Sequence, residues 1–304
     1  EVLDDAQVRC RVVPEPGQWI RLSGEDVTRG ATVLHRGVRL GPAALGLAAS
    51  IGLSHLEVAV RPRVALLSTG DELVMPGDVP PEAMPPGAIY NSNRFFLRSL
   101  LERMGCVVTD LGIVPDQFEA TRQALHQASL HHDLILTSGG VSVGEEDHIK
   151  PAVQALGQLH LWSLAIKPGK PFAFGALRHA PDRADSTSAH FIGLPGNPVA
   201  TMVAFYFFAR PALHRLAGAH VPAPVTVRAI SEVDIQKKSG RTEFQRGLLS
   251  RAPEGELRVR TTGAQGSGIL SSMTEANAMI VLHHDRGSVS QGGWVDVLLF
   301  DGLT

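Results

Sequence analysis

Apolar and polar positions along residues 61–217 follow patterns that predict strands and helices in turn. Val64–Ser68 and Leu134–Thr137 are short apolar runs of the kind found in buried parallel strands. Between them, Arg94–Met104 repeats apolar residues at helical spacing and stops at Gly105. Strands that alternate with helices predict an α/β three-layer sandwich, in which helices cover both faces of a mostly parallel sheet.

The pattern changes at both ends of this region. From about Ala223 the helical periodicity stops, and short strand candidates separated by Gly, Pro and Ser predict a small C-terminal β-barrel domain. Residues 1–60 combine short β-like runs with an Ala/Leu-rich helix at Pro42–Ile51. We therefore expect three parts: partial N-terminal domains with a β-rich segment and a linking helix (1–60), an α/β domain (61–217) and a C-terminal β domain (218–304).

Composition narrows the class of protein. Of the 304 residues, 44% are hydrophobic, which is enough for packed cores and argues against disorder. The 28 basic side chains nearly balance the 30 acidic ones and form no basic cluster, so nucleic-acid binding is not expected. With only Cys10 and Cys106, neither a disulfide framework nor a paired-cysteine metal site is expected. No apolar run approaches the roughly 20 residues of a membrane helix, and we predict a cytoplasmic protein.

A glycine-rich turn directly follows the strand Leu134–Thr137. In parallel sheets, ligands bind at the carboxyl ends of strands. Adjacent glycines allow backbone N–H groups to approach an anion closely, and serines add hydroxyl donors. A plain β-turn is the alternative. The nearby acids at 145–147 favour a binding site instead, in which a cation offsets the repulsion between the carboxylates and a bound anion. The candidate binding residues here are Ser138, Gly139, Gly140, Val141 and Ser142.

Acidic residues follow two other predicted strands. Thr69 and Gly70 lie just past the strand Val64–Ser68, with Glu72 close behind. Asp116 follows the strand that ends at Val114, where an isolated acid is more often a helix N-cap than a catalyst. Together with the glycine-rich turn, Glu72 and Asp116 become candidates for chemistry.

Two proline-framed turns complete the set. Lys167 and Lys170 lie in the sequence KPGKP, where restricted backbone suits them to clamping an oxyanion, although exposed lysines are usually only solvated. The second turn precedes the last predicted helix of the domain, and Asn197 as N-cap with Pro198 at the first helical position explains half of it. Its candidate binding residues are Pro195, Gly196, Asn197 and Pro198.

These motifs resemble one known family. The matching segments are STGDEL (68–73), IYNSN (89–93), SGGVSVGEED (138–147), AIKPGKPFAFG (165–175), LPGNPVA (194–200), GRTEFQR (240–246) and GSGILSSMTEANAMIVL (266–282). In these residues the chain resembles the molybdopterin molybdenumtransferases, the MoeA-type enzymes related to the E domain of gephyrin. The resemblance covers essentially the whole chain and implies a MogA/MoaB-like fold for the α/β domain.

The resemblance implies a specific reaction in molybdenum cofactor biosynthesis. Such enzymes insert molybdenum from molybdate into adenylylated molybdopterin and release AMP. The glycine turn would cradle phosphate, the two lysines would attract molybdate, and the prolines would shape the pocket. Glu72, Asp116 and Asp147 would be catalytic and would hold Mg²⁺. The resemblance further implies a homodimer in which Asp26 reaches the partner's cleft, and it makes the adenylyltransferase of the same pathway a candidate partner.

One departure and two alternatives accompany this prediction. The family carries an acidic motif upstream of Asp26 that has no counterpart here, so we expect an N-terminally truncated chain. The alternatives are a molybdopterin adenylyltransferase-like enzyme and a non-catalytic, gephyrin-like scaffold. The sequence leaves open which acid binds the metal, whether tungsten is accepted, and which molybdoenzymes receive the cofactor.

Overall fold

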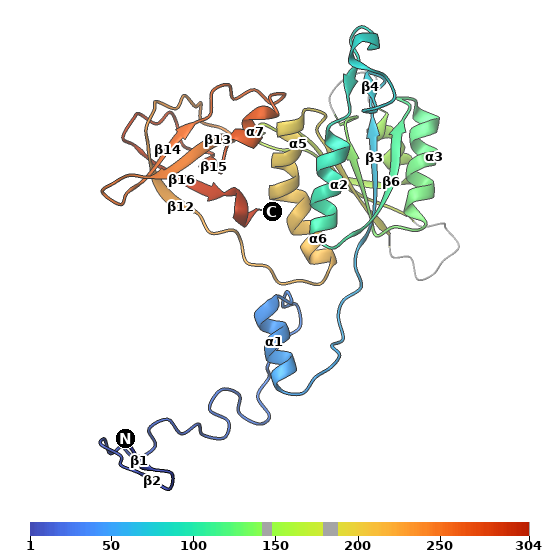
Figure 1. Cartoon of the computed structure of the whole chain (residues 1–304). Helices are drawn as coiled ribbons and strands as arrows, with labels where there is room; N and C mark the ends of the chain where they lie inside the picture. The colour runs from blue at the N-terminus through green and yellow to red at the C-terminus, as the bar shows by residue number, and fades with distance from the viewer. Residues whose placement is uncertain (142–147, 179–187, 304) are drawn as a thin grey trace. The chain divides into compact units, whose positions relative to one another are not determined.

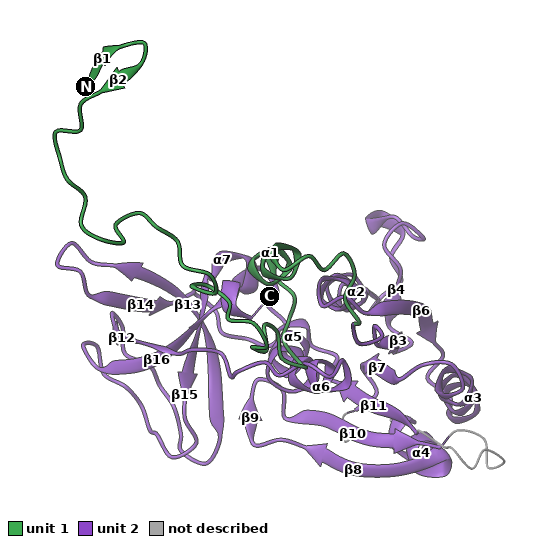
Figure 2. Cartoon of the chain, turned by 90° about the horizontal axis from the view of Figure 1, so that it is seen from below, with its two compact units in different colours: residues 1–57 green, residues 58–304 purple. Residues whose placement is uncertain are grey.

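The computed structural model describes residues 1–141, 148–178 and 188–303 (Figure 1). These residues form two compact units, Glu1–Glu57 and Val58–Thr304, which Figure 2 distinguishes by colour. The predicted division into three parts stays a prediction.

A six-stranded sheet forms the centre of the second unit. Its spatial order is β6 (Val107–Val114), β3 (Arg63–Thr69), β7 (Leu134–Ser138), β11 (Ala189–Leu194), β10 (Pro171–Leu177) and β8 (Gly157–Ser163). The first four strands are parallel, whereas β10 runs antiparallel to both of its neighbours. The prediction of a mostly parallel sheet is confirmed. The reversal occurs at β10 and β11, which follow each other in the chain without a described helix between them.

Helices cover both faces of this sheet, as the sequence predicts. Alternate residues of β3 point to opposite faces: Val64 and Leu66 belong to one buried cluster, and Ala65 and Leu67 to the other. The first cluster includes residues of α2 (Asn93–Arg103), α5 (Pro198–Ala204) and α6 (Arg210–Leu216). The second includes residues of α3 (Phe118–Ser129) and α4 (Ile149–Leu156). The three layers of the predicted sandwich are therefore present.

The last predicted helix of this domain, which begins at Pro198, is interrupted. A π-helical segment, η2 (Phe205–Ala209), separates α5 from α6. Pro211 lies at the second position of α6 and has no N–H to donate to the carbonyl of Phe207. This missing donor gives a physical reason for the change of helical pitch.

A closed barrel of five strands follows, which confirms the predicted C-terminal β domain. Its order is β14 (Leu257–Thr261), β12 (Val227–Ser231), β16 (Trp294–Leu299), β15 (Ala278–Leu282) and β13 (Thr242–Arg251), and β13 pairs with β14 to close it. Short helices α7 (Ser271–Glu275) and η3 (Phe300–Gly302) flank β15 and β16. The strand β9 (Ile166–Lys167), which precedes β10, pairs in parallel with β13 and joins the barrel to the α/β part.

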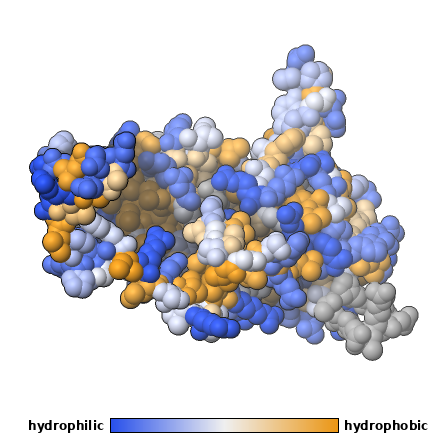
Figure 3. Space-filling model, turned by 60° about the horizontal axis from the view of Figure 1, so that its bottom comes forward, coloured by the Kyte–Doolittle hydropathy of each residue, from blue (hydrophilic) through white to orange (hydrophobic). Residues whose placement is uncertain are grey.

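Two smaller features complete the second unit. A short arm carries the parallel pair β4 (Leu73–Val74) and β5 (Ile89–Tyr90) and the single turn η1 (Pro81–Ala83), and it projects beyond the sheet (Figure 1). On the face seen in Figure 3, apolar patches are scattered among polar ones. None of the helices in the described residues is both long enough and apolar enough to cross a membrane.

The first unit is sparse. It contains a hairpin of β1 (Val2–Asp4) and β2 (Gln7–Val8), and the helix α1 (Pro42–Ser50) with Pro42 at its first position. The helix agrees with the prediction to one residue. Large apolar side chains such as those of Val13 and Trp19 are exposed, and Ala48 is the buried hydrophobic residue of this unit.

Candidate active site

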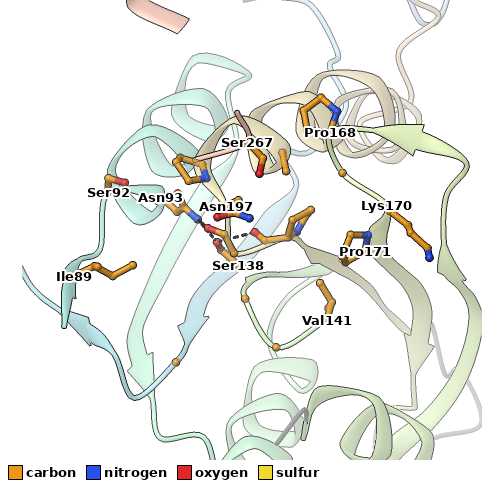
Figure 4. A pocket seen from close by; sticks show the side chains of 18 of the residues that line it. Ile89, Ser92, Asn93, Ser138, Val141, Pro168, Lys170, Pro171, Asn197 and Ser267 are labelled. Carbon is orange, nitrogen blue, oxygen red and sulfur yellow. Dashed lines mark hydrogen bonds between the residues drawn. The ribbon is translucent and has the colours of Figure 1, made fainter. Parts of the chain in front are cut away.

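A cleft of about 650 Å³ opens at the carboxyl ends of β3, β7 and β11 (Figure 4). It is lined by every predicted site residue of the second unit that the structure describes: Thr69, Gly70, Glu72, Asp116, Ser138, Gly139, Gly140, Val141, Lys167, Lys170, Pro195, Gly196, Asn197 and Pro198. The other predicted residues are not among them. Ser142 and Asp147 lie outside the described residues, and Asp26 is an exposed residue of the first unit. The functional roles of all these residues stay predictions.

The glycine turn is shaped by contacts that exclude a side chain. Gly139 and Gly140 have φ angles of +90° and +66°, in the left-handed region that favours glycine. A Cβ on Gly139 would lie 2.4 Å from the carbonyl oxygen of Thr69, and one on Gly140 would lie 2.5 Å from the Thr69 hydroxyl. The Gly139 N–H donates to the Leu194 carbonyl at 3.1 Å and so helps to hold the turn rather than facing an anion.

An asparagine that we did not single out from the sequence ties the strand-end loops together. The Asn93 amide, at the start of α2, donates to the Ser138 hydroxyl at 2.8 Å and to the Gly196 carbonyl at 2.6 Å. It also lies 3.3 Å from the Thr201 hydroxyl, which donates to the Pro195 carbonyl at 2.6 Å. Ser138 is thereby engaged within the protein. The IYNSN motif (89–93) was the available signal for Asn93.

The two alternatives based on helix capping have different outcomes. Pro198 is the first residue of α5 and Asn197 occupies the N-cap position, but the Asn197 side chain makes no capping hydrogen bond. For Asp116 the N-cap interpretation is wrong, because α3 begins at Phe118 and Gln117 occupies its N-cap. Asn197 and Asp116 are both among the residues that line the cleft.

Two acids and several polar groups face the same space. The Glu72 carboxylate folds over Gly70, where an added Cβ would lie 2.6 Å from Oε2. The Asp116 N–H donates to the Asp71 carboxylate at 3.1 Å. In the part of the chain that the structure describes, the buried Thr69 Oγ1 and Asn91 Nδ2 of the cleft have no hydrogen-bond partner. Buried polar atoms of this kind suit a ligand that supplies their missing partners.

The described residues contain no group of three His, Cys, Asp or Glu side chains that could hold a metal ion. The predicted Mg²⁺ set includes Asp147, which is outside them. Mg²⁺ commonly takes one or two carboxylates from a protein and completes its shell with substrate phosphates and water. Glu72 and Asp116, which line one cleft, fit that requirement.

Two cations of the cleft share one buried carboxylate. Glu243 of β13 is only 2% exposed, and its carboxylate lies 3.2 Å from Lys167 Nζ and 3.4 Å from Arg241 Nε. Both cations are about half exposed and line the cleft, as does Lys170. Sequence reasoning missed Arg241 and Glu243, although both stand in the GRTEFQR motif (240–246).

Comparison with known proteins agrees with this architecture. The chain matches three family models: a probable molybdopterin binding domain (residues 65–215), the MoeA C-terminal region, domain IV (228–300), and the MoeA N-terminal region, domain I and II (1–52). It is 40% identical over 301 residues to the molybdopterin molybdenumtransferase of Haemophilus influenzae, covering 99% of this chain and 71% of that protein. Gephyrin of Dictyostelium discoideum is 32% identical, over 98% of this chain and 45% of that protein.

A solved structure of the molybdopterin biosynthesis moeA protein from Pyrococcus horikoshii OT3 superposes with a TM-score of 0.73 at 28% identity, over 91% of this chain and 63% of that one. The chain thus spans less than two thirds of that structure and less than half of the gephyrin relative. The fold defines a class of α/β protein with an attached β-barrel, and its α/β part matches the model described as a probable molybdopterin binding domain. The chain belongs to the molybdopterin molybdenumtransferase (MoeA) family, an enzyme family of molybdenum cofactor biosynthesis.

Proposed function

We propose that this chain catalyses molybdenum insertion from molybdate into adenylylated molybdopterin, with release of AMP. The observation that carries the proposal is the composition of the cleft. Glycine turns, acids and cations line one space of about 650 Å³, which barrel residues close from the other side. A substrate with phosphates, a nucleotide and an incoming oxyanion needs all of these groups together.

Different residues of the cleft would bind phosphate, attract molybdate and transfer the proton. The turns at Gly140 and Gly196 let phosphate approach the backbone closely. Lys167, Lys170 and Arg241 supply positive charge for molybdate. Exchange of molybdate oxo groups for dithiolene sulfur releases oxygen as hydroxide or water, so a positioned acid such as Asp116 can move the proton that this step requires.

Mg²⁺ fits the acidic side of the cleft. Glu72 and Asp116 would hold it, with Asp147 as the third predicted acid. When bound, the ion neutralises the negative charge that carboxylates, phosphates and molybdate bring into one pocket. The side chains of this chain would then orient the substrate, and a water molecule from solvent would cleave its phosphoanhydride bond as AMP leaves.

The test separates the proposed reaction from the adenylyltransferase alternative. The purified chain is incubated with adenylylated molybdopterin, Mg²⁺ and molybdate, and AMP is quantified. Molybdate-dependent AMP release supports insertion, whereas AMP transfer from ATP to molybdopterin supports the alternative. A chain that does neither but retains its fold contradicts an enzymatic role and favours the scaffold.

We further propose that the chain works as a cytoplasmic homodimer in which Asp26 completes the cleft of the partner subunit. Light scattering on the purified chain measures the mass of the assembly. Mixing Asp26→Asn with Asp116→Asn then tests the shared site, because each mixed dimer would contain one intact cleft. Recovery of about a quarter of wild-type activity is expected for random exchange of subunits in a two-fold dimer. No recovery in a dimer with proven exchange would contradict the shared cleft.

A further inference from the structure

The barrel contains a buried cation with an unusual set of partners. The Arg246 side chain, on β13, is completely buried. No carboxylate in the described residues lies within ion-pair distance of it, and burial lowers the pKa of its guanidinium. A buried charge without an opposite charge is strongly unfavourable unless hydrogen bonds compensate for it.

The compensating bonds all come from one segment, the loop that begins at Ala264 and runs into the first turn of α7 at Ser272. Arg246 Nε donates to the Ser272 hydroxyl at 2.9 Å, and Nη2 donates to the carbonyls of Ala264 at 3.3 Å and Gly266 at 3.0 Å. The main chain of Arg246 also binds the Gln265 side chain, through its N–H at 2.9 Å and its carbonyl at 3.1 Å. The loop 264–272 is therefore wrapped around a single arginine.

This loop forms the barrel wall of the cleft. Gln265, Gly266 and Ser267 line the cleft, and the Ser267 carbonyl accepts the Val199 N–H at 3.0 Å from the first turn of α5 (Figure 4). Because the peptide bond is planar and trans, a Gly266 carbonyl directed at Arg246 turns the Ser267 N–H the opposite way. The guanidinium thus fixes the orientation of the peptide groups in this wall.

We propose that Arg246 is a positioning residue for the cleft: its buried guanidinium holds the segment 264–267 in the conformation that binds the anionic substrate. This inference rests on the proposed function for its kinetic consequence. Arg246 does not line the cleft, so it acts through the loop and not by touching the substrate. The cost of burying the charge is offset by its hydrogen bonds to this segment, and the same bonds set the segment's geometry.

The same barrel offers a matched control. Lys237 is only 6% exposed, and its ammonium also donates to three carbonyls, those of Lys238 at 3.2 Å, His284 at 3.3 Å and Arg286 at 2.6 Å. None of these residues lines the cleft. Arg246 and Lys237 are therefore both buried cations that donate hydrogen bonds to backbone carbonyls, but only the segment bound by Arg246 lines the cleft.

The experiment compares Arg246→Met, Arg246→Lys and Lys237→Met in the full chain. We measure KM for molybdate and kcat in AMP release, thermal stability, and hydrogen exchange of the amides at 264–268. Arg246→Met is expected to raise KM about tenfold while kcat changes less than about twofold, because ground-state binding is lost. It should also speed exchange at 264–268. Arg246→Lys should fall between wild type and Arg246→Met, since it keeps the charge but loses the planar fork.

Lys237→Met is expected to lower thermal stability and to speed exchange only near 284–286, with a wild-type KM. Equal changes in KM for Lys237→Met and Arg246→Met would overturn the inference, because the effect would then be general destabilisation. If Arg246→Met does not fold, Arg246→Lys decides, and wild-type exchange at 264–268 in that variant would contradict positioning. If the wild-type chain releases no AMP, the proposed function fails while the exchange data still test the role of Arg246.

Discussion

The two walls of the cleft are built by different physical means. The α/β wall consists of turns at the ends of β3, β7 and β11, where close backbone contacts at Gly139 and Gly140 leave no room for side chains. In the barrel wall, two buried charged side chains hold the lining residues in place. Glu243 forms ion pairs with Lys167 and Arg241, and Arg246 donates hydrogen bonds to the segment 264–272. The α/β wall requires residues without a Cβ atom at its turns, whereas the barrel wall requires ion pairs and hydrogen bonds to buried charged side chains.

The difference predicts how each wall responds to change. A backbone turn packed against another backbone cannot relax without moving a strand, so a small addition has a large effect. A loop held by side-chain hydrogen bonds loosens when one bond is removed, which alters affinity before it alters the fold. Three substitutions in the cleft walls test this contrast, and a fourth at a remote ion pair gives the smallest expected effect.

Gly139→Ala should have the largest effect, because it strikes the backbone-packed wall. The new Cβ would lie 2.4 Å from the Thr69 carbonyl oxygen, at a φ of +90°. We expect a loss of about 3 kcal/mol or more in the free energy of unfolding and no measurable molybdate-dependent AMP release. Denaturant unfolding and the AMP assay measure the two effects.

Gly287→Ala is the control for that variant, since a Cβ there would meet no atom within 4 Å and the backbone is not left-handed. It should behave as wild type. Near-normal stability and activity of Gly139→Ala would show that the α/β wall can relax around an added Cβ atom. That result would contradict the proposed difference between the two walls.

Asp116→Asn tests a side chain of the same wall. The substitution keeps size and removes the charge and the proton-accepting group. We expect kcat to fall about 100-fold, with the free energy of unfolding close to wild type. Steady-state kinetics with molybdate as the varied substrate measure it. An unchanged kcat would remove Asp116 from the chemistry and leave it as a lining residue.

Glu243→Gln tests the ion pairs that the buried Glu243 carboxylate forms with Lys167 and Arg241. The amide keeps the shape but loses the attraction for two half-exposed cations. Since those cations can be hydrated, we expect a loss of only about 1 kcal/mol in the free energy of unfolding, and a smaller dependence of stability on salt than in wild type. Unfolding at low and high ionic strength measures both. A salt dependence equal to that of wild type would contradict the role of this ion-pair cluster.

Asp133→Asn lies at the opposite end of the sheet and should have the smallest effect. Side-chain hydrogen bonding from Arg63 lowers the pKa of Asp133. A lowered folded-state pKa gives stability that is present above the unfolded value of about 3.9 and is lost as pH falls through the folded value. With the carboxylate one-third exposed, we expect a difference of about 0.5 kcal/mol at pH 7 that disappears in acid.

Unfolding of both proteins from pH 7 to pH 2 follows that difference, and AMP release serves as the second measurement. Activity should be unchanged, since this pair is remote from both walls. A difference that grows in acid would contradict the sign of the linkage.

Much of the α/β wall could be predicted from the sequence, because its signals are local. Apolar runs such as Leu134–Thr137 predict buried strands, and a glycine pair directly after one of them predicts a backbone-lined turn. Parallel strands then bring the ends of separate runs to one edge of the sheet, so that Gly139, Thr69 and Gly196 line one cleft.

The barrel wall could not be derived in the same way. Arg246 and Glu243 are charged residues of β13, and periodicity alone predicts that the charged residues of a strand are solvated. Their burial depends on pairing across the fold, as β9 with β13 places Lys167 beside Glu243. Asn93 was missed for a related reason, because its three partners come from segments 45 to 108 residues away. Long-range contacts of this kind leave little trace in the local pattern.

The most direct test of the account is a crystal structure of the chain soaked with molybdate and AMP. We expect the AMP phosphate at the turns around Gly140 and Gly196, and molybdate near Lys167 and Arg241, with ordered contacts to both walls. Binding of both ligands outside the cleft at the carboxyl ends of β3, β7 and β11 would contradict the account.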